Sequence, residues 1–283
     1  MVDSPVANVS DTAKWIAVYR AWESARPDAL FHDCYARVLA GERGEAIAAL
    51  MPRQSRNGWP MIARTKLIDD HVQAAIAAGA DCILNLAAGL DTRPYRLDLP
   101  ATLRWVEIDL PTLTTEKEQL LAQAQPRCQL SRIKADLSDP RARTLALREA
   151  LGTTAKTLVI TEGLLTYLDE DQVRALSAAL IAEVGIHWWI FDLASPALLQ
   201  AIRKSFGKYL TNAPMKFAPS NGVGFFAALG WRIAKVESVL HAAARFRRLP
   251  WLLRLFALFP APNCSNPGKW RWYGIVKLQR SRK

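Results

Sequence analysis

The sequence predicts an α/β protein with a doubly wound, mostly parallel sheet of seven strands and a helical cover at its N-terminus. Short apolar runs alternate with amphipathic stretches along most of the 283 residues. The first run, Cys82 to Leu86, leads through Gly89 into Asp91-Thr92, which can cap a new helix. A second run, Trp105 to Asp109, ends in an acid about 20 residues after that glycine, where Rossmann-like folds place a ribose-binding carboxylate.

Residues 1–78 are predicted to form an N-terminal helical cover that precedes a core of residues 79–283. Apolar spacing indicates helices over residues 11–50, interrupted at Arg26-Pro27-Asp28, and over residues 61–78, with a loop at 52–60 between them. No Ser/Gly/Pro-rich linker or internal repeat separates cover from core. We therefore expect one compact domain.

The rest of the chain continues the alternation of strands and helices. We expect helices from Pro111 to Ala124 and over residues 169–184 and 225–229, and later strands over residues 131–134, 157–161, 187–193, 231–237 and 272–278. The modest connection between the last two strands is consistent with an antiparallel insertion at the edge of the sheet. The prolines of 195–221 predict an irregular lid segment there, and 241–268 is expected to form a second lid insertion.

Composition favours a metal-free, cytoplasmic protein. The cysteines form no C-x-x-C pair, and the histidines form neither H-x-x-x-H nor H-E-x-x-H. Residues 1–11 contain acids and no continuous apolar run, so no signal peptide is predicted. No stretch reaches the roughly 18 apolar residues of a membrane span.

The net charge of +11 and the pI near 9.7 raise the question of an anionic partner. Lysines and arginines are dispersed along the chain, which favours a solvated surface over a nucleic-acid groove. Residues 245–259 are both basic and apolar. Two hypotheses fit this stretch, a membrane-interface segment and a cover over an acceptor pocket.

The turn after the first strand predicts a nucleotide ligand other than NAD. The dinucleotide fingerprint requires three glycines, whereas Ala87 and Ala88 precede the single Gly89. A ligand without phosphate, such as S-adenosylmethionine, suits this turn better. The signatures of P-loop ATPases and of serine hydrolases are absent from the sequence.

Five motifs in order resemble the leucine carboxyl methyltransferase family, which includes bacterial O-methyltransferases of polyketide and other small-molecule pathways. They extend over nearly the whole chain, and they imply the class I methyltransferase fold with S-adenosylmethionine as cofactor. The motifs are Glu23 to Asp33, Asn-Leu-Ala-Ala-Gly-Leu-Asp-Thr-Arg-Pro-Tyr-Arg-Leu from Asn85, Val-Glu-Ile-Asp-Leu-Pro from Val106, Ala135-Asp136-Leu137, and Thr-Glu-Gly-Leu-Leu-Thr-Tyr-Leu from Thr161.

The resemblance implies a role for several residues in binding the cofactor. Arg64 is expected to hold the carboxylate of the methionine moiety, and Glu162 to lie beside its amine. Gly89 would allow a close approach of the backbone, and Asp109 would accept from the ribose hydroxyls. Asp136 and the Leu137 N–H would face the adenine. Each of the three acids also has a simpler interpretation as a helix cap or a turn residue.

Two positions depart from the family pattern. Ala87 replaces the first glycine of the Gly-x-Gly turn found in the leucine-specific branch, which favours the small-molecule branch. Cys34 replaces a common proline, without a functional interpretation.

The resulting hypothesis is an O-methyltransferase of secondary metabolism that acts on a carboxylate or hydroxyl of a small apolar or aromatic, polyketide-like molecule. Trp15, Trp22 and Trp59 in the cover segment predict an apolar acceptor pocket. No catalytic residue is assigned, because aligning the two reactants can supply much of the acceleration. The alternatives are a carboxyl methyltransferase of a protein or peptide C-terminus, and a membrane-surface binding protein that retains the fold.

Overall fold

A computed structural model describes residues 5–52, 55–152 and 156–281. Its described residues form a seven-stranded sheet in the order β3-β2-β1-β4-β5-β7-β6. All neighbours pair in parallel except β7, which lies antiparallel between β5 and β6. The predicted fold class is therefore confirmed. The strands are β1 (Cys82–Leu86), β2 (Arg104–Asp109), β3 (Gln129–Lys134), β4 (Thr157–Thr161), β5 (Ile186–Ala194), β6 (Trp231–Ser238) and β7 (Tyr273–Arg280).

Two central strands begin and end at the predicted residues, and the other five differ by one or two residues at one or both ends. Every residue of β1 and β4 is buried, as expected of parallel strands covered on both faces. The edge strand β3 instead alternates exposed and half-buried residues. The continuous apolar runs thus mark the centre of the sheet.

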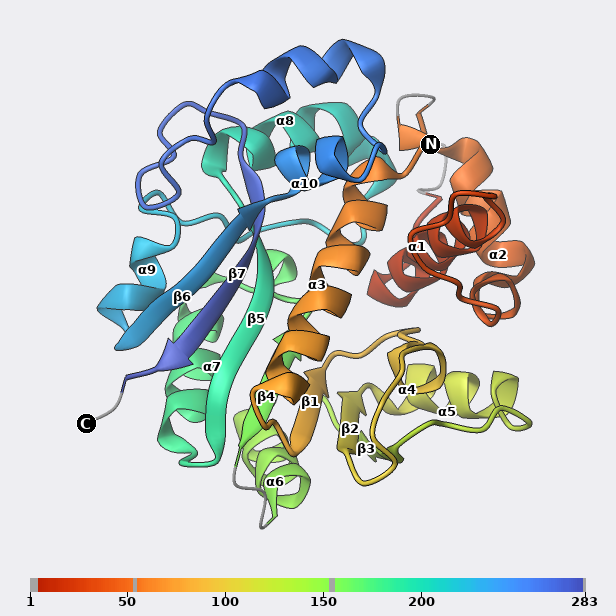
Figure 1. Ribbon diagram of the computed structural model, residues 1–283, viewed down its shortest axis with the longest axis vertical. Helices are drawn as coiled ribbons and strands as arrows, with labels where there is room; N and C mark the ends of the chain where they lie inside the picture. Colours follow the sequence, from red (N-terminus) through yellow and green to blue (C-terminus); the bar gives the residue numbers. More distant parts are fainter. Residues whose placement is uncertain (1–4, 53–54, 153–155, 282–283) are drawn as a thin grey trace.

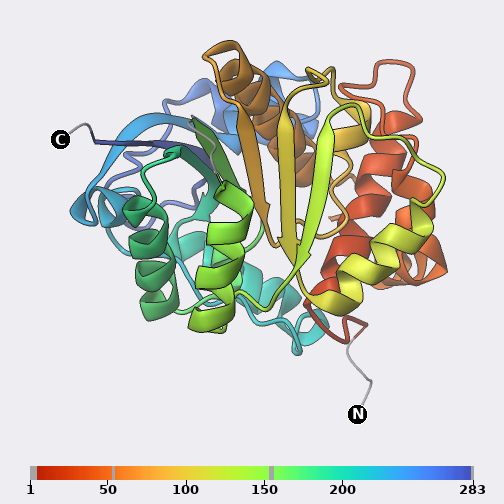
Figure 2. The same ribbon diagram turned by 90° about the horizontal axis from the view of Figure 1, so that it is seen from below.

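Helices lie on both faces of the sheet (Figures 1 and 2). One face packs against α3 (Trp59–Ala77) and α10 (Val239–Arg245), and the other against α6 (Pro140–Leu151), α7 (Glu170–Ala182) and α9 (Gly224–Ala228). Successive side chains of β5 point to opposite faces of the sheet. Trp188 packs on the face covered by α3 and α10, and Trp189 packs on the face covered by α6, α7 and α9. The sheet is doubly wound, as predicted.

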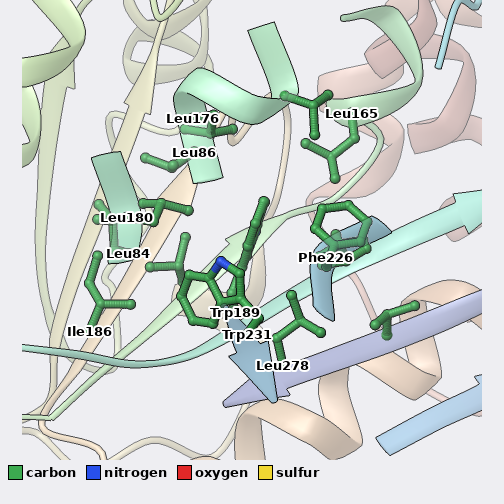
Figure 3. Packing of buried hydrophobic residues seen from close by; sticks show 14 of the residues in the cluster. Leu84, Leu86, Leu165, Leu176, Leu180, Ile186, Trp189, Phe226, Trp231 and Leu278 are labelled. Atoms are coloured by element: carbon green, nitrogen blue, oxygen red, sulfur yellow. The ribbon is translucent and has the colours of Figure 1, made fainter. Parts of the chain in front are cut away.

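Two buried tryptophans on the face covered by α6, α7 and α9 each have a hydrogen-bond partner for the indole N–H. The indole N–H of Trp189 donates to the Thr161 hydroxyl at 2.9 Å, and that of Trp231 donates to the Ser177 hydroxyl at 2.9 Å. The aromatic rings and the leucines of α7 and β1 fill the space between the layers (Figure 3). Large indoles can be buried here because their polar atoms are satisfied.

The N-terminal helices α1 (Val9–Ser24) and α2 (Ala36–Leu50) form a separate layer beside α4 (Arg93–Arg96) and α5 (Pro111–Leu120) (Figure 1). Arg20 of α1 donates to the Leu90 carbonyl at 2.6 Å and to Asp33 at 2.8 Å. Asp33 also accepts from the Thr92 hydroxyl at 2.6 Å. These bonds fasten the cover to the turn that follows β1.

The turn after β1 is held in an unusual conformation. Both Ala87 (φ 53°) and Gly89 (φ 51°) lie in the left-handed region, which is costly for alanine. The helix that follows is only one turn long, and Asp91, rather than Thr92, accepts the backbone N–H of Arg93. Of the two predicted capping residues, Asp91 is therefore confirmed, whereas Thr92 occupies the N-cap position without a side-chain capping bond.

The structure differs from the sequence prediction in three further segments. Residues 196–206 form a regular helix, α8 (Pro196–Phe206), rather than an irregular lid, because Ser195 caps it and Pro196 occupies its first turn. The helix begun at Pro111 ends at Leu120 instead of Ala124, and α6 was not predicted. Shorter 3₁₀ segments are η2 (Leu165–Tyr167), η3 (Gly207–Tyr209) and η4 (Trp251–Leu258). Across the described ranges, no helix combines the length and apolar character needed to cross a membrane.

Candidate functional site

A cavity of about 670 Å³ opens at the carboxyl ends of the parallel strands. This edge of the sheet is where open α/β folds bind ligands. The six residues predicted to bind the cofactor all line the cavity, namely Arg64, Gly89, Asp109, Asp136, Leu137 and Glu162. Arg64 reaches it from the N-terminal part of α3. This helix was predicted as part of the cover segment, but it packs on the sheet.

Glu162 lies at the centre of a buried ion network. One of its carboxylate oxygens accepts from Arg64 Nε at 2.8 Å, and the other lies 2.8 Å from Arg93 Nη1. Arg93 is 2% exposed, and it also binds Asp91 at 2.8 Å and Asp69 at 2.6 Å. The two arginines therefore join α3, the turn after β1 and the end of β4.

The network continues to the far side of Arg64. Its Nη1 donates to the Tyr273 hydroxyl at 3.2 Å and lies 3.5 Å from Asp192. The Tyr273 hydroxyl donates to Asp192 at 2.9 Å, and the Gly163 N–H donates to the other oxygen of Asp192 at 2.6 Å. The ends of β5 and β7 are thus tied to α3.

The network holds more negative than positive charge. Arg64, Arg93 and Arg96 face four carboxylates, those of Asp69, Asp91, Glu162 and Asp192, which leaves a formal excess of one negative charge. Burial by itself raises the pKa of Glu162, but the charges of Arg93 and Arg64 outweigh it, so that the pKa is lowered. The pKa of Asp91 is likewise lowered by Arg93 despite its burial. Both groups stay ionised at neutral pH.

Asp109 ends β2 and shapes the neighbouring turn. One carboxylate oxygen accepts the Gly89 N–H at 2.5 Å, and the other accepts the Leu110 N–H at 2.7 Å. Burial raises the pKa of this carboxyl. Asp109 therefore has the turn-stabilising contacts of the simpler interpretation, while its side chain borders the cavity.

Asp136 and Leu137 follow β3 at the rim of the cavity. Asp136 is exposed and accepts the Ser138 N–H at 2.8 Å. Hydrogen bonding by the Ser138 side chain, together with this backbone bond, lowers the pKa of Asp136. The Leu137 carbonyl accepts from Arg143 at 3.0 Å. The turn predicted as an alternative for Asp136 is present, and it presents both residues to the cavity.

Apolar side chains make up the part of the cavity away from the ion network. They come from α1, the start of α3, the loop after β4, α8 and the segment that follows it, and they include Trp15, Ile16, Trp59, Met61, Leu164, Leu198, Ile202, Phe206, Met215 and Phe217. The predicted apolar pocket is therefore present. Trp15 and Trp59 contribute to it as expected, whereas Trp22 packs between α1 and its neighbours.

The two predicted lid insertions differ in their relation to the cavity. Residues 195–221 supply α8 and several lining side chains, whereas no residue of 241–268 lines the cavity. The interpretation of residues 245–259 as a cover over the acceptor pocket is therefore wrong.

Six residues of the network were not predicted as part of the site, among them Asp69 on α3 and Arg96 on α4. Asp91 and Arg93 belong to the motif after β1, where they were interpreted as a helix start, and Asp192 and Tyr273 belong to β5 and β7. An aspartate within the apolar run of β5 was the available signal, because a buried carboxylate requires a partner. Tyr273 gave no comparable signal.

The described residues that line the cavity include no histidine, cysteine or lysine. Three tyrosines are present, and burial raises the pKa of each, to about 12 for Tyr19 and well above the usual value for Tyr273. None of these groups has a pKa near neutrality, which a general base for an alcohol or phenol requires.

Comparison with known families identifies residues 13–181 as a match to the leucine carboxyl methyltransferase family. A putative S-adenosyl-L-methionine-dependent methyltransferase of Frankia alni is 37% identical over 263 residues, which cover 84% of this chain and 89% of the relative. One of Rhodococcus jostii is 30% identical and covers 87% and 90%. One of Parafrankia sp. is 34% identical over 181 residues, and the match spans 60% of this chain and 58% of that relative.

Solved structures share the architecture at low sequence identity. A duf574 family protein from Streptomyces avermitilis superposes with a TM-score of 0.59 at 17% identity, covering 95% of this chain and 97% of the other. A putative methyltransferase from Thermobifida fusca gives 0.56 at 18% identity, covering 99% and 97%. The likeness to these two concerns the fold.

Replacing Arg93 by Met tests the buried network. The change keeps much of the side-chain length but leaves Asp69, Asp91 and Glu162 without a shared partner, so the free energy of unfolding at neutral pH should fall by about 3–5 kcal/mol. Urea titration measures this value, with Arg141→Met on the exposed surface of α6 as control, expected to change stability by less than about 0.5 kcal/mol. Equal free energies of unfolding for Arg93→Met and Arg141→Met would contradict the claim that the buried network stabilises the fold.

The free energies of unfolding of wild type and Arg93→Met should respond differently to acid. Asp91 and Glu162 have folded-state pKa values below their unfolded ones, so their contribution is present above about pH 5 and is lost as the pH falls. Without Arg93 their burial raises both pKa values instead. The stability difference between wild type and Arg93→Met should therefore narrow between about pH 7 and pH 4.5.

Proposed function

The chain belongs to the leucine carboxyl methyltransferase family of S-adenosylmethionine-dependent enzymes, and we propose that it methylates the carboxylate of a small, largely apolar molecule. The observation that carries this proposal is the joining of two surfaces in one cavity. A network of buried ions lies at the strand ends, and a wall of apolar side chains from α1 and α8 faces it.

The residues of the network fit the charges of the cofactor. S-adenosylmethionine carries a sulfonium, an ammonium and a carboxylate, so its net positive charge matches the excess negative charge of the network. Arg64 donates to protein partners from Nε and Nη1, which leaves Nη2 for the cofactor carboxylate. Glu162 and Asp192 would face the ammonium and sulfonium, and the cofactor supplies an electrophilic methyl group.

The nucleoside part of the cofactor would lie along the ends of β2 and β3. Asp109 retains acceptor capacity beyond its two backbone bonds and would take the ribose hydroxyls. Asp136 and the Leu137 N–H would face the adenine. Ala87 and Gly89 lie in the left-handed turn and have a small side chain or none, so the backbone of this turn can lie close to the nucleoside.

The acceptor would occupy the apolar part of the cavity. Its wall of tryptophan, leucine, isoleucine, methionine and phenylalanine side chains favours an aliphatic or aromatic molecule. A peptide C-terminus also offers a carboxylate, but its backbone amides require polar partners. The apolar lining therefore favours a small molecule over a peptide.

A carboxylate acceptor matches the absence of a suitable base among the described lining residues. Its pKa of about 4 means that it arrives ionised. The bound cofactor would supply the methyl group, so that an acceptor lone pair would form the O–CH₃ bond as the S–CH₃ bond breaks and its electrons stay on a neutral thioether sulfur. Glu162 is a weak base because two arginines hold its pKa down. The protein contributes alignment and exclusion of water.

Asp109→Ala tests the placement of the cofactor. Removing the carboxylate leaves the ribose hydroxyls without an acceptor, so the affinity for S-adenosylmethionine should fall by about 1–3 kcal/mol in calorimetry. Asp171→Ala, an exposed position in the first turn of α7, is the control and should bind like wild type. Thermal unfolding of both variants shows whether loss of the Gly89 bond has disturbed the fold. Unchanged affinity in a folded Asp109→Ala would remove the ribose assignment.

The pH dependence of the chemical step tests the carboxylate acceptor. With the cofactor saturating and a carboxylate-bearing acceptor in single turnover, the rate should vary little between about pH 6.5 and 8.5, because the nucleophile is ionised throughout. A rise of nearly tenfold per pH unit would instead identify an alcohol or phenol that must lose its proton.

A further inference from the structure

Residues 251–259, here called the apolar platform, expose most of their large side chains. Trp251, Leu252, Leu255, Phe256, Leu258 and Phe259 are between 61% and 80% exposed. Elsewhere in the described chain, Trp270 is the only other large aromatic residue exposed to this degree. Monomeric proteins rarely expose such a contiguous group without a binding partner.

The platform is held in place rather than loosely attached. Its inner side chains, Leu253 and Ala257, pack against the core between α3, α10 and the sheet. Arg248, just before it, binds Glu23 of α1 at 2.8 Å, and the carbonyl of Phe259 lies 2.8 Å from His241 Nε2. The inner face is therefore occupied, and the outer side chains cannot turn inward to bury themselves. The platform contacts α10 and lies at the upper border of the molecule in Figure 1.

The charge of this part of the chain is strongly one-sided. From Ser238 to Lys283 there are ten lysines and arginines and no aspartate or glutamate. This segment therefore contributes ten of the eleven net positive charges of the protein. Arg245, Arg247 and Arg254, which precede or belong to the platform, are exposed. Lysines and arginines also occur along the rest of the chain, so the excess positive charge of this segment results from its lack of aspartate and glutamate.

We propose that the apolar platform docks the protein on the surface of an anionic phospholipid bilayer. Tryptophan, leucine and phenylalanine side chains insert at the boundary between headgroups and acyl chains, and neighbouring arginines attract anionic headgroups. The combination distinguishes a membrane surface from a protein partner, because exposed cations around an apolar centre complement a uniformly negative surface. The proposal is independent of the methyl acceptor.

Cosedimentation of the full chain with vesicles tests the proposal. The protein should bind vesicles of phosphatidylcholine and phosphatidylglycerol in equal parts, and bind phosphatidylcholine alone at least about tenfold more weakly. Leu255→Ser, Phe256→Ser and Leu258→Ser combined should weaken binding about 100-fold. Arg247→Gln with Arg254→Gln should weaken binding to the anionic vesicles about tenfold.

The matched control is Leu145→Ser with Val184→Ser, which removes two exposed apolar side chains far from the platform in sequence and should bind as wild type. Thermal unfolding should be unchanged in all variants, because each altered side chain is exposed. Wild type that stays in the supernatant with both vesicles, or a triple variant that binds equally well, overturns the proposal. A dimer in gel filtration that the triple variant abolishes, without vesicle binding, assigns the platform to contact between copies.

Discussion

The buried ion network at the carboxyl ends of the strands constrains the rest of the structure. A carboxylate removed from water requires compensation by cations and hydrogen bonds, and the loss of one partner is costly. Glu162 therefore depends on both Arg64 and Arg93, which in turn require Asp69, Asp91 and Asp192. Because these residues come from α3, β4, β5 and the turn after β1, the network fixes those elements relative to one another.

The apolar and ionic parts of the cavity have complementary effects. The α1 helix is tied to the turn after β1 through Arg20 and Asp33, and α8 is started by Ser195 directly after β5. Both helices contribute apolar side chains to the same cavity as the charged ones. Electrostatic interactions strengthen when water is excluded. A methyl transfer that neutralises a sulfonium and a carboxylate is suited to such a site, because the two reactants need alignment more than proton transfer.

The sequence predicted the sheet better than it predicted the site. Apolar runs such as Cys82–Leu86 mark buried parallel strands directly. Motifs at the strand ends predicted five residues that line the cavity, and the helix before the first strand supplied the sixth, Arg64. Asp192 and Tyr273 were missed because their partners lie on α3, far away in sequence, and side-chain pairing over that distance leaves no local pattern. Residues 196–206 were misread because Pro196 acts as the first residue of a helix rather than as a breaker.

Calorimetry of Arg64→Lys with S-adenosylmethionine tests the central claim most directly, with Arg141→Lys on the exposed surface as control. Lysine keeps the positive charge but lacks the planar fork that contacts Glu162 and Tyr273 and that, in our proposal, would also bind the cofactor carboxylate. The account predicts a cofactor affinity at least about tenfold weaker in the folded variant than in wild type. Equal affinity of Arg64→Lys and wild type would mean that the buried network is structural and that the cofactor is held elsewhere.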